Sequence, residues 1–297
     1  MMVYKKSIGE RAFDIFNVAV LTLYALSCAI PFIHVLSGSF TAGHLITGKE
    51  LILIPKKFTL ENYRFAFTVG PILTALKSSL ILTVFGTMFE LAGPISMAYP
   101  LAHKDLVGRN FITWMIIIAM FTSGGLIPTY LLVRALGLVN TYWALFIPQA
   151  VGISNIIYFR NFFSNIPKEI EESALLDGAN DIYILIKIIL PLSVPVIATF
   201  TLFIAVGNWN SFFAPLIYLN DHKKWPIQVV LRQIMQTAQI MSDTGYSAYS
   251  GYSEDEAPTP AAVKLAIIII ATGPIILLYP LLQKHFVKGI IVGSLKG

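Results

Sequence analysis

The hydrophobic positions of this chain fall into long runs, separated by shorter stretches that carry most of the charged residues. A helix needs roughly 20 consecutive, mostly apolar residues to cross the hydrocarbon core of a bilayer. Runs that approach or exceed this length cover residues 16–36, 73–99, 111–133, 142–162, 188–218 and 261–286. The pattern predicts an all-α integral membrane protein with six transmembrane helices.

Several of these runs contain proline, which removes a backbone hydrogen bond from a helix. Such breaks are tolerated in a membrane where neighbouring helices satisfy the freed backbone groups. The prolines within the predicted spans include Pro94, Pro191, Pro195, Pro215 and Pro274. We therefore expect the spans to form a packed bundle.

Composition agrees with a membrane protein, because only 12% of the 297 residues are charged and 56% are hydrophobic. The net charge of +5 is spread over short loops, so no basic surface for nucleic acid is expected. The one cysteine, Cys28, excludes a disulfide within the chain. The run 16–36 is too long for the core of a signal peptide, and we interpret it as a retained span.

Residues that could support catalysis or metal binding lack the spacing that such sites need. The five histidines are scattered, and the motifs H-E-x-x-H and G-x-S-x-G are absent from the sequence. The segment from Gly43 to Lys49 resembles a phosphate-binding loop, but Glu50 stands where a hydroxyl would ligate magnesium. We expect a non-catalytic subunit that holds no metal, cofactor or nucleotide itself.

Glu90 is the one acidic residue inside a predicted span. An ionisable group within a membrane is a functional-site hypothesis by default, because its burial in lipid is costly. Its place late in the second span also suits a hydrogen bond between packed helices. A role in the transport pathway and a structural role both remain open for Glu90.

A polar and aromatic group lies late in the fifth run. Asparagines are costly in hydrocarbon unless they are paired or face an aqueous cavity. Amides combined with aromatic faces are typical of carbohydrate binding, and this favours a sugar pathway. Asparagines that join helices beside an interfacial aromatic belt are an equal alternative. The candidate pathway residues are Asn208, Trp209, Asn210, Phe212 and Phe213.

The charged segment 166–179 cannot span a membrane, although apolar runs lie on both sides of it. Pro167 suits the first position of a helix, acidic residues follow in the first turns, and Gly178 suits the helix end. A narrow apolar stripe including Ile170 and Ala174 could fit the groove of a partner protein. A helix lying on the lipid surface is less favoured, because it would need a larger apolar face and a more basic polar face.

The same segment carries a family resemblance. Glu172-Ser173-Ala174-x-x-x-Gly178, nine further residues and Ile188-x-Leu190-Pro191 resemble the EAA signature of ABC importer permeases, with Ser173 in place of the first alanine. In that family the segment is a cytoplasmic coupling helix that docks into an ATPase subunit. The resemblance implies a coupling helix over about 166–180, with the working positions Glu171, Glu172, Ser173, Ala174, Asp177, Gly178 and Pro191.

Further stretches are similar to permeases of the maltose-type carbohydrate uptake family. The segment 208–213 resembles their W-N-x-F/Y region, and the tail 287–297 ends like that of the smaller maltose permease. The opening run and the segment 225–228 are similar to the LplC/YtcP-like branch, for which pectin and alginate oligosaccharides are candidate cargo. The resemblance implies an N-terminal span and loop (1–72), a permease core (73–286) and a cytoplasmic tail (287–297).

The resemblance also implies the partners and the location. They are a second permease subunit, two ATPase subunits that bind ATP and magnesium, an extracytoplasmic solute-binding protein and an oligosaccharide substrate, in a bacterial cytoplasmic membrane. Basic residues divide almost evenly between the two sides, so the positive-inside rule does not orient the chain. The coupling helix orients it instead, with both termini cytoplasmic.

One alternative function remains open. An ion-coupled secondary transporter of small polar solutes would show inverted repeats and several carboxylates within spans, whereas only Glu90 lies in one here.

The loop 219–260 has two interpretations. It is either a solvated loop or a contact surface for an extracytoplasmic partner, with Trp225 as its aromatic anchor.

Overall fold

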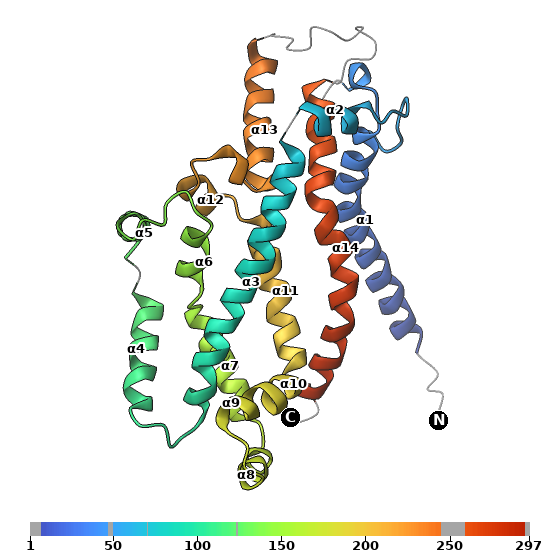
Figure 1. The fold of residues 1–297 in the computed structure, drawn as a ribbon. Helices are drawn as coiled ribbons and strands as arrows, with labels where there is room; N and C mark the ends of the chain where they lie inside the picture. Colours follow the sequence, from blue (N-terminus) through green and yellow to red (C-terminus); the bar gives the residue numbers. More distant parts are fainter. Residues whose placement is uncertain (1–6, 47–49, 70, 123, 245–258, 295–297) are drawn as a thin grey trace. The chain divides into compact units, whose positions relative to one another are not determined.

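The computed structural model describes residues 7–46, 50–69, 71–122, 124–244 and 259–294. Parts of the phosphate-loop-like segment (47–49), the loop 219–260 (245–258) and the tail (295–297) lie outside the described residues. The described elements are helices, with one isolated β-bridge between Thr41 and Phe58 (Figure 1). The predicted all-α class is confirmed.

The chain divides into two compact units, which are described separately. Unit 1 comprises Met1–Gly70 and Leu231–Thr272, and unit 2 comprises Pro71–Val230 and Gly273–Gly297. Two helices, α13 (Ile227–Thr244) and α14 (Pro260–Ser294), contribute residues to both units.

Unit 1 contains α1 (Ile8–Ser39), η1 (Gly43–Leu45) and α2 (Glu61–Val69). The polar end of α1 packs against the loop and α2 through buried hydrogen bonds. The Asn62 amide donates to the carbonyls of Ser39 and Thr41, both at 2.9 Å, and the Ser39 and Tyr63 hydroxyls are 2.7 Å apart. Burial raises the pKa of the Tyr63 hydroxyl, so this side chain stays neutral over the physiological range.

The other helices belong to unit 2, and α3 (Ile72–Ala102) packs against three of them, α6, α7 and α11 (Figure 1). Its elements in chain order are α4 (Arg109–Phe121), α5 (Leu126–Ala135), α6 (Trp143–Gln149), α7 (Ile153–Ser164), α8 (Lys168–Leu176), α9 (Asp181–Ile184), η2 (Leu185–Ile189, a π-helical turn), α10 (Leu190–Leu192), α11 (Val194–Asn210), α12 (Phe213–Tyr218) and η3 (His222–Lys224). One apolar cluster of unit 2 joins α3, α7 and the segment α9–η2, and a second joins α3, α6 and α12.

The backbone of α3 approaches the backbone at the end of α6 closely, at a point where α3 carries a glycine. A Cβ atom built on Gly93 of α3 would lie 1.9 Å from the carbonyl oxygen of Ala150, which ends α6. No side chain can occupy that space, so Gly93 is required by the close approach of the two backbones.

The number of membrane-spanning helices differs from the prediction. Among the described residues, α1, α3 and Pro260–Leu278 of α14 are each long and apolar enough to cross a membrane. Two bent pairs, α4 with α5 and Asp181–Leu192 with α11, bring the number to five if each pair is one span. The predicted span 142–162 is divided into α6 and α7, because Pro148 and Gly152 interrupt the helix. The count of six is therefore not confirmed.

Candidate functional site

The predicted charged helix is present as α8, between α7 and α9 at one end of unit 2 (Figure 1). None of its residues is buried, and Leu176 is 89% exposed. Ala174 packs partly against the apolar cluster of α3 and α7, as do Ile166 and Ala179 on either side of the helix. The helix therefore rests on the bundle along a narrow stripe, and Glu172, Ser173 and Asp177 face solvent.

Gly178 ends α8 in a conformation that other residues rarely adopt. Its φ is +84°, in the left-handed region, and nothing lies within 4 Å of the position of a Cβ atom. The Gly178 N–H donates to the Leu175 carbonyl at 3.0 Å, and the Ala179 N–H donates to the Ala174 carbonyl at 3.0 Å. This is the Schellman pattern. Asn180 then caps α9, because its side-chain oxygen accepts from the Tyr183 N–H at 2.8 Å.

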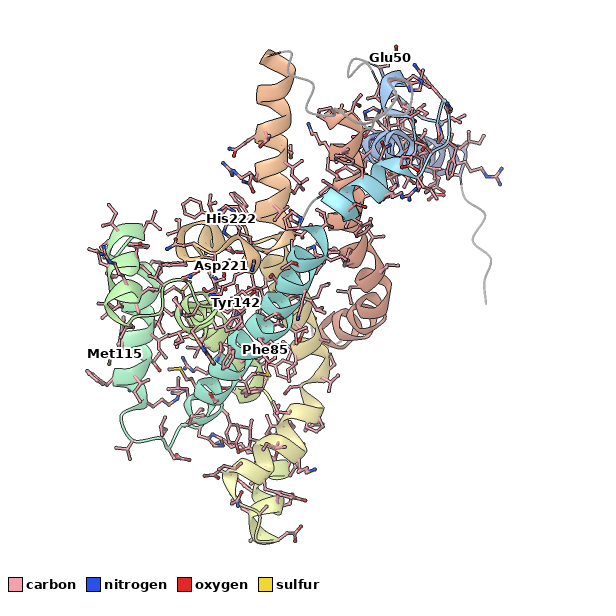
Figure 2. The ribbon with its side chains drawn as sticks, turned by 45° about the horizontal axis from the view of Figure 1, so that its top comes forward. Glu50, Phe85, Met115, Tyr142, Asp221 and His222 are labelled. Atoms are coloured by element: carbon pink, nitrogen blue, oxygen red, sulfur yellow. The ribbon has the colours of Figure 1, made fainter. Side chains whose placement is uncertain are left out.

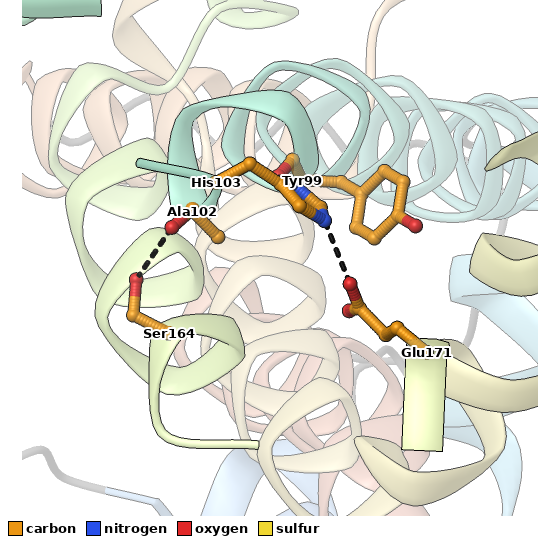
Figure 3. Close-up of polar contacts among 5 residues, drawn as sticks. All are labelled: Tyr99, Ala102, His103, Ser164 and Glu171. Carbon is orange, nitrogen blue, oxygen red and sulfur yellow. Dashed lines mark hydrogen bonds and ion pairs between the residues drawn. The ribbon is translucent and has the colours of Figure 1, made fainter. Parts of the chain in front are cut away.

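Glu171 connects α8 to the end of α3. Its carboxylate lies 2.7 Å from Nε2 of His103, the residue that follows the last turn of α3 (Figure 3). The His103 ring meets the Tyr99 ring edge-on, with centroids 4.9 Å apart. The Ser164 hydroxyl at the end of α7 also lies 3.5 Å from the Ala102 carbonyl (Figure 3). The segment around α8 is thus held to the terminus of α3 on two sides.

Pro191 lies just before a break in the chain of helices. It occupies α10, and the chain bends by 80° between Asp181–Leu192 and α11. Ser193 at the bend is fully buried, and its hydroxyl donates to the Ile189 carbonyl at 2.6 Å. Pro195 lies in the first turn of α11, where its missing N–H costs no hydrogen bond within the helix, so the break at Ser193 accommodates it.

Glu90, whose structural or pathway role the sequence left open, has a partner on α11. The Asn208 amide donates to the Glu90 carboxyl at 3.2 Å. Gly86, one turn earlier on α3, makes room for this contact, since a Cβ atom there would lie 3.0 Å from the Asn208 amide nitrogen. The contact joins α3 and α11, as the structural reading of Glu90 requires.

Asn208 also lines a small, open hollow of unit 2. The hollow presents two amides, a hydroxyl, an aromatic ring and aliphatic carbon. Its lining residues are Leu82, Leu145, Phe146, Gln149, Asn208, Ser211 and Pro215. None of these residues is charged, so the groups that border the hollow are neutral hydrogen-bonding groups and apolar carbon.

The other candidates of the polar and aromatic group lie around this hollow without lining it. Trp209 is 5% exposed, within the bundle. Asn210 is exposed and accepts a hydrogen bond from Gln228 at 3.4 Å, and the Phe213 ring is 54% exposed. Phe212 and Phe213 flank the break between α11 and α12, with ring centroids 6.4 Å apart. The structure therefore brings together Asn208 and Glu90 and separates them from the remaining four.

Trp225 is held within unit 2 at the other end of α3. Its indole N–H donates to the Leu219 carbonyl at 2.8 Å, and its ring stacks on His222 at 4.0 Å. Asp221 and His222 lie in the same region as Tyr142 (Figure 2), whose hydroxyl donates to Ser78 at 3.0 Å. Trp225 thus packs against its own chain, which does not favour its role as an anchor for a partner.

The comparisons with known proteins decide the family. The sequence pattern of the family described as "Binding-protein-dependent transport system inner membrane component" matches residues 2–292. The chain belongs to this family. It is therefore a non-catalytic membrane component of a binding-protein-dependent transport system.

Individual relatives cover almost the whole of this transport component. The polygalacturonan/rhamnogalacturonan transport system permease protein YtcP of Bacillus subtilis is 44% identical over 97% of this chain and 99% of its own length. The protein LplC of the same organism is 43% identical over 97% of this chain and 96% of its own. A chain in the crystal structure of a bacterial ABC transporter involved in the import of the acidic polysaccharide alginate matches with a TM-score of 0.84. It is 30% identical and covers 96% of this chain and 100% of that one.

Sequence reasoning on this transport component missed His103, Gly86 and Gln149. His103 and Glu171 are 68 positions apart, and no local motif joins them. Gly86 and Gln149 are likewise far in sequence from Asn208, which lies beside both. The residues that the structure describes include no group of three or more His, Cys, Asp or Glu residues that could hold a metal ion. The contacts of α8 and of Asn208 are therefore the features from which a function can be argued.

Proposed function

We propose that this chain is the permease subunit of an ATP-driven importer of oligosaccharides rich in uronic acid. The observation that carries the proposal is similarity over nearly the whole chain to a permease for polygalacturonan and rhamnogalacturonan. The matching fold of an alginate importer, which also handles an acidic polysaccharide, supports the same class of cargo.

In this proposal α8 is the coupling helix, and it lies on the cytoplasmic side with both termini of the chain. It is short and charged, its C-terminal end is closed by the Schellman turn at Gly178, and its face with Glu172, Ser173 and Asp177 is exposed to a partner. Two ATPase subunits supply the energy, a second permease subunit completes the pathway, and a solute-binding protein delivers the sugar. The chain then works as an N-terminal segment (1–72), a permease core (73–286) and a cytoplasmic tail (287–297).

The hollow beside Asn208 is this chain's share of the sugar pathway. Sugars present hydroxyl groups that amides can both donate to and accept from. Gln149 at the end of α6, and Asn208 and Ser211 at the end of α11, offer polar groups of this kind. The Phe146 ring offers an apolar surface beside them. Glu90 orients Asn208 and thereby keeps one amide hydrogen bond within the protein.

The transport activity can be tested with the assembled complex in proteoliposomes. We expect uptake of a labelled galacturonate oligosaccharide that requires both internal-side ATP and the binding protein, with competition from unlabelled alginate or pectin oligosaccharides. A neutral maltooligosaccharide with the same number of sugar units serves as the matched control and should not compete. Uptake driven by a sodium or proton gradient in the absence of ATP would instead establish the ion-coupled alternative.

The pathway assignment has a separate test in Gln149→Ala. Loss of one amide from the hollow removes hydrogen bonds to the sugar that are each worth about 0.5–1.5 kcal/mol, so uptake should fall by roughly threefold to tenfold. The amount of assembled complex should not change. Gln233→Ala on α13 removes an exposed amide and is the control. Equal uptake by the two variants would show that the hollow does not contact sugar.

A further inference from the structure

We propose that His103 is a positioning residue that ties the coupling helix to α3, so that movement of α8 is transmitted to α3 as well as to α11. The inference rests on the proposed function, since it assumes that α8 moves with an ATPase subunit. It concerns a contact between residues 68 positions apart that the coupling motif does not include.

The ring of His103 is fixed on both of its nitrogens. Nδ1 lies 3.0 Å from the Tyr99 carbonyl oxygen, and Nε2 lies 2.7 Å from the Glu171 carboxylate. A neutral imidazole donates through only one nitrogen, whereas the doubly protonated ring donates through both. Nε2–H can therefore donate to the Glu171 carboxylate, which gives a hydrogen bond to a charged acceptor. Charge-assisted hydrogen bonds of this kind are roughly twice as strong as neutral ones.

The positions of the two groups on their helices suit the pair. His103 lies at the C-terminal end of α3, where exposed carbonyls favour hydrogen-bond donors. Glu171 lies in the first turn of α8, where free N–H groups favour a negative charge. The side chain of Glu171 is 17% exposed and that of His103 is 38% exposed, so the contact is partly shielded from water. The bond is therefore suited to carry force between the two helices.

The anchor on the α3 side is rigid. Tyr99, whose carbonyl holds His103, is 7% exposed and contacts Phe163 of α7 with ring centroids 6.5 Å apart. Its own ring also packs against the edge of His103. A pull on Glu171 therefore displaces the end of α3 before it can rotate the imidazole away from its neighbours.

The contact closes a ring of connected elements. From α8 the chain continues through α9, η2 and α10 into α11, where Asn208 donates to Glu90 of α3. From Glu90, α3 continues for 13 residues, or about 20 Å at 1.5 Å per residue, to His103. The Glu171 contact then returns to α8. Both helices that meet at the hollow are in this way attached to the coupling helix, one covalently and one through His103.

The test is a double-mutant cycle in the reconstituted importer, with His103→Ala, Glu171→Ala and the two combined. Substrate-stimulated ATPase activity and uptake are measured, and co-purification of the ATPase subunits reports assembly. We expect each single variant to lower the stimulated rates about tenfold and the double variant to be no worse than either single one. If the double variant instead lowers the stimulated rates about a hundredfold, the two single effects multiply. Glu171 then acts on the ATPase independently of His103, and the proposal is overturned.

Two further variants separate a positioning role from a packing role. Gln places an N–H donor near the position of Nε2, so His103→Gln should retain at least half of the stimulated rate. His103→Leu fills similar space without a donor and should behave like His103→Ala. Equal activity of the Gln and Leu variants would contradict the tether. Asp105→Ala, which removes an exposed charge from the same loop, is the control and should leave the rates unchanged.

Failure of the tether and failure of the proposed function give different results. If disruption of the α8 end at Gly178 uncouples the importer but His103→Ala does not, the tether is wrong and the coupling role of α8 stands. If ATP supports no uptake in the unmodified complex, the proposed function itself is wrong.

Discussion

Replacement of Gly178 by valine should reduce substrate-stimulated ATPase activity and uptake at least tenfold in the assembled importer. Gly178 has a φ of +84°, and a β-branched residue held in the left-handed region costs roughly 1–3 kcal/mol. Nothing lies within 4 Å of the added Cβ, so within this chain we expect the effect to come from the backbone. The chain should relieve the strain by opening the Schellman turn, which changes the direction in which α8 leaves the bundle.

Gly178→Asn is the matched control, because asparagine tolerates the left-handed region far better than valine does. It adds a polar side chain at the same exposed position and should keep most of the coupled activity. Co-purification of the ATPase subunits and the basal ATPase rate are measured for both variants. Coupled activity that is equally lost in both would mean that bulk on this face, and not the backbone turn, is what the partner rejects.

Gly93→Ala is expected to have the largest effect on folding. A Cβ atom at this position would lie 1.9 Å from the Ala150 carbonyl oxygen, so α3 must move away from the end of α6. Overpacking of a close contact costs typically about 1–3 kcal/mol, and contact with a backbone atom leaves no side chain free to rotate aside. The variant should yield much less assembled complex, with a thermal midpoint lower by several degrees.

Gly207→Ala provides the comparison on α11. No atom lies within 4 Å of a Cβ at this position, and alanine is favoured over glycine inside a helix by about 0.5–1 kcal/mol. This variant should be as stable as the parent or slightly more stable. Thermal midpoints measured in the same detergent decide the outcome. A Gly93→Ala midpoint equal to that of Gly207→Ala would show that α3 and α6 lie farther apart than the structure places them.

The sequence was sufficient to predict features that depend on local patterns. Long apolar runs predicted the membrane helices, and the acidic first turn and Gly178 predicted the bounds of α8 to within a few residues, because capping is decided by near neighbours. The family resemblance was confirmed by the match over residues 2–292. The roles of individual residues in coupling and in the pathway stay predictions.

Features that depend on distant parts of the chain were not predictable in this way. Apolar content identified residues 142–162 as one span, yet Pro148 and Gly152 divide them into α6 and α7. Composition also grouped Asn208 with Asn210, although only Asn208 contacts Glu90 and lines the hollow. His103 appeared to be one of several scattered histidines. Its partner became visible only once α3 and α8 were placed side by side.

The contact between Glu90 and Asn208 has a consequence for how the protein is made. The two residues are 118 positions apart, so at about 5–20 residues per second the ribosome needs roughly 6–24 s to supply the partner of Glu90. During that interval the carboxyl group of α3 has no amide to bind, and its insertion into lipid is costly. By contrast, α1 has a mean hydropathy of 2.0 over its apolar window and faces no such delay. Membrane insertion of α3 should therefore be completed late, together with α11, while α1 already anchors the nascent chain.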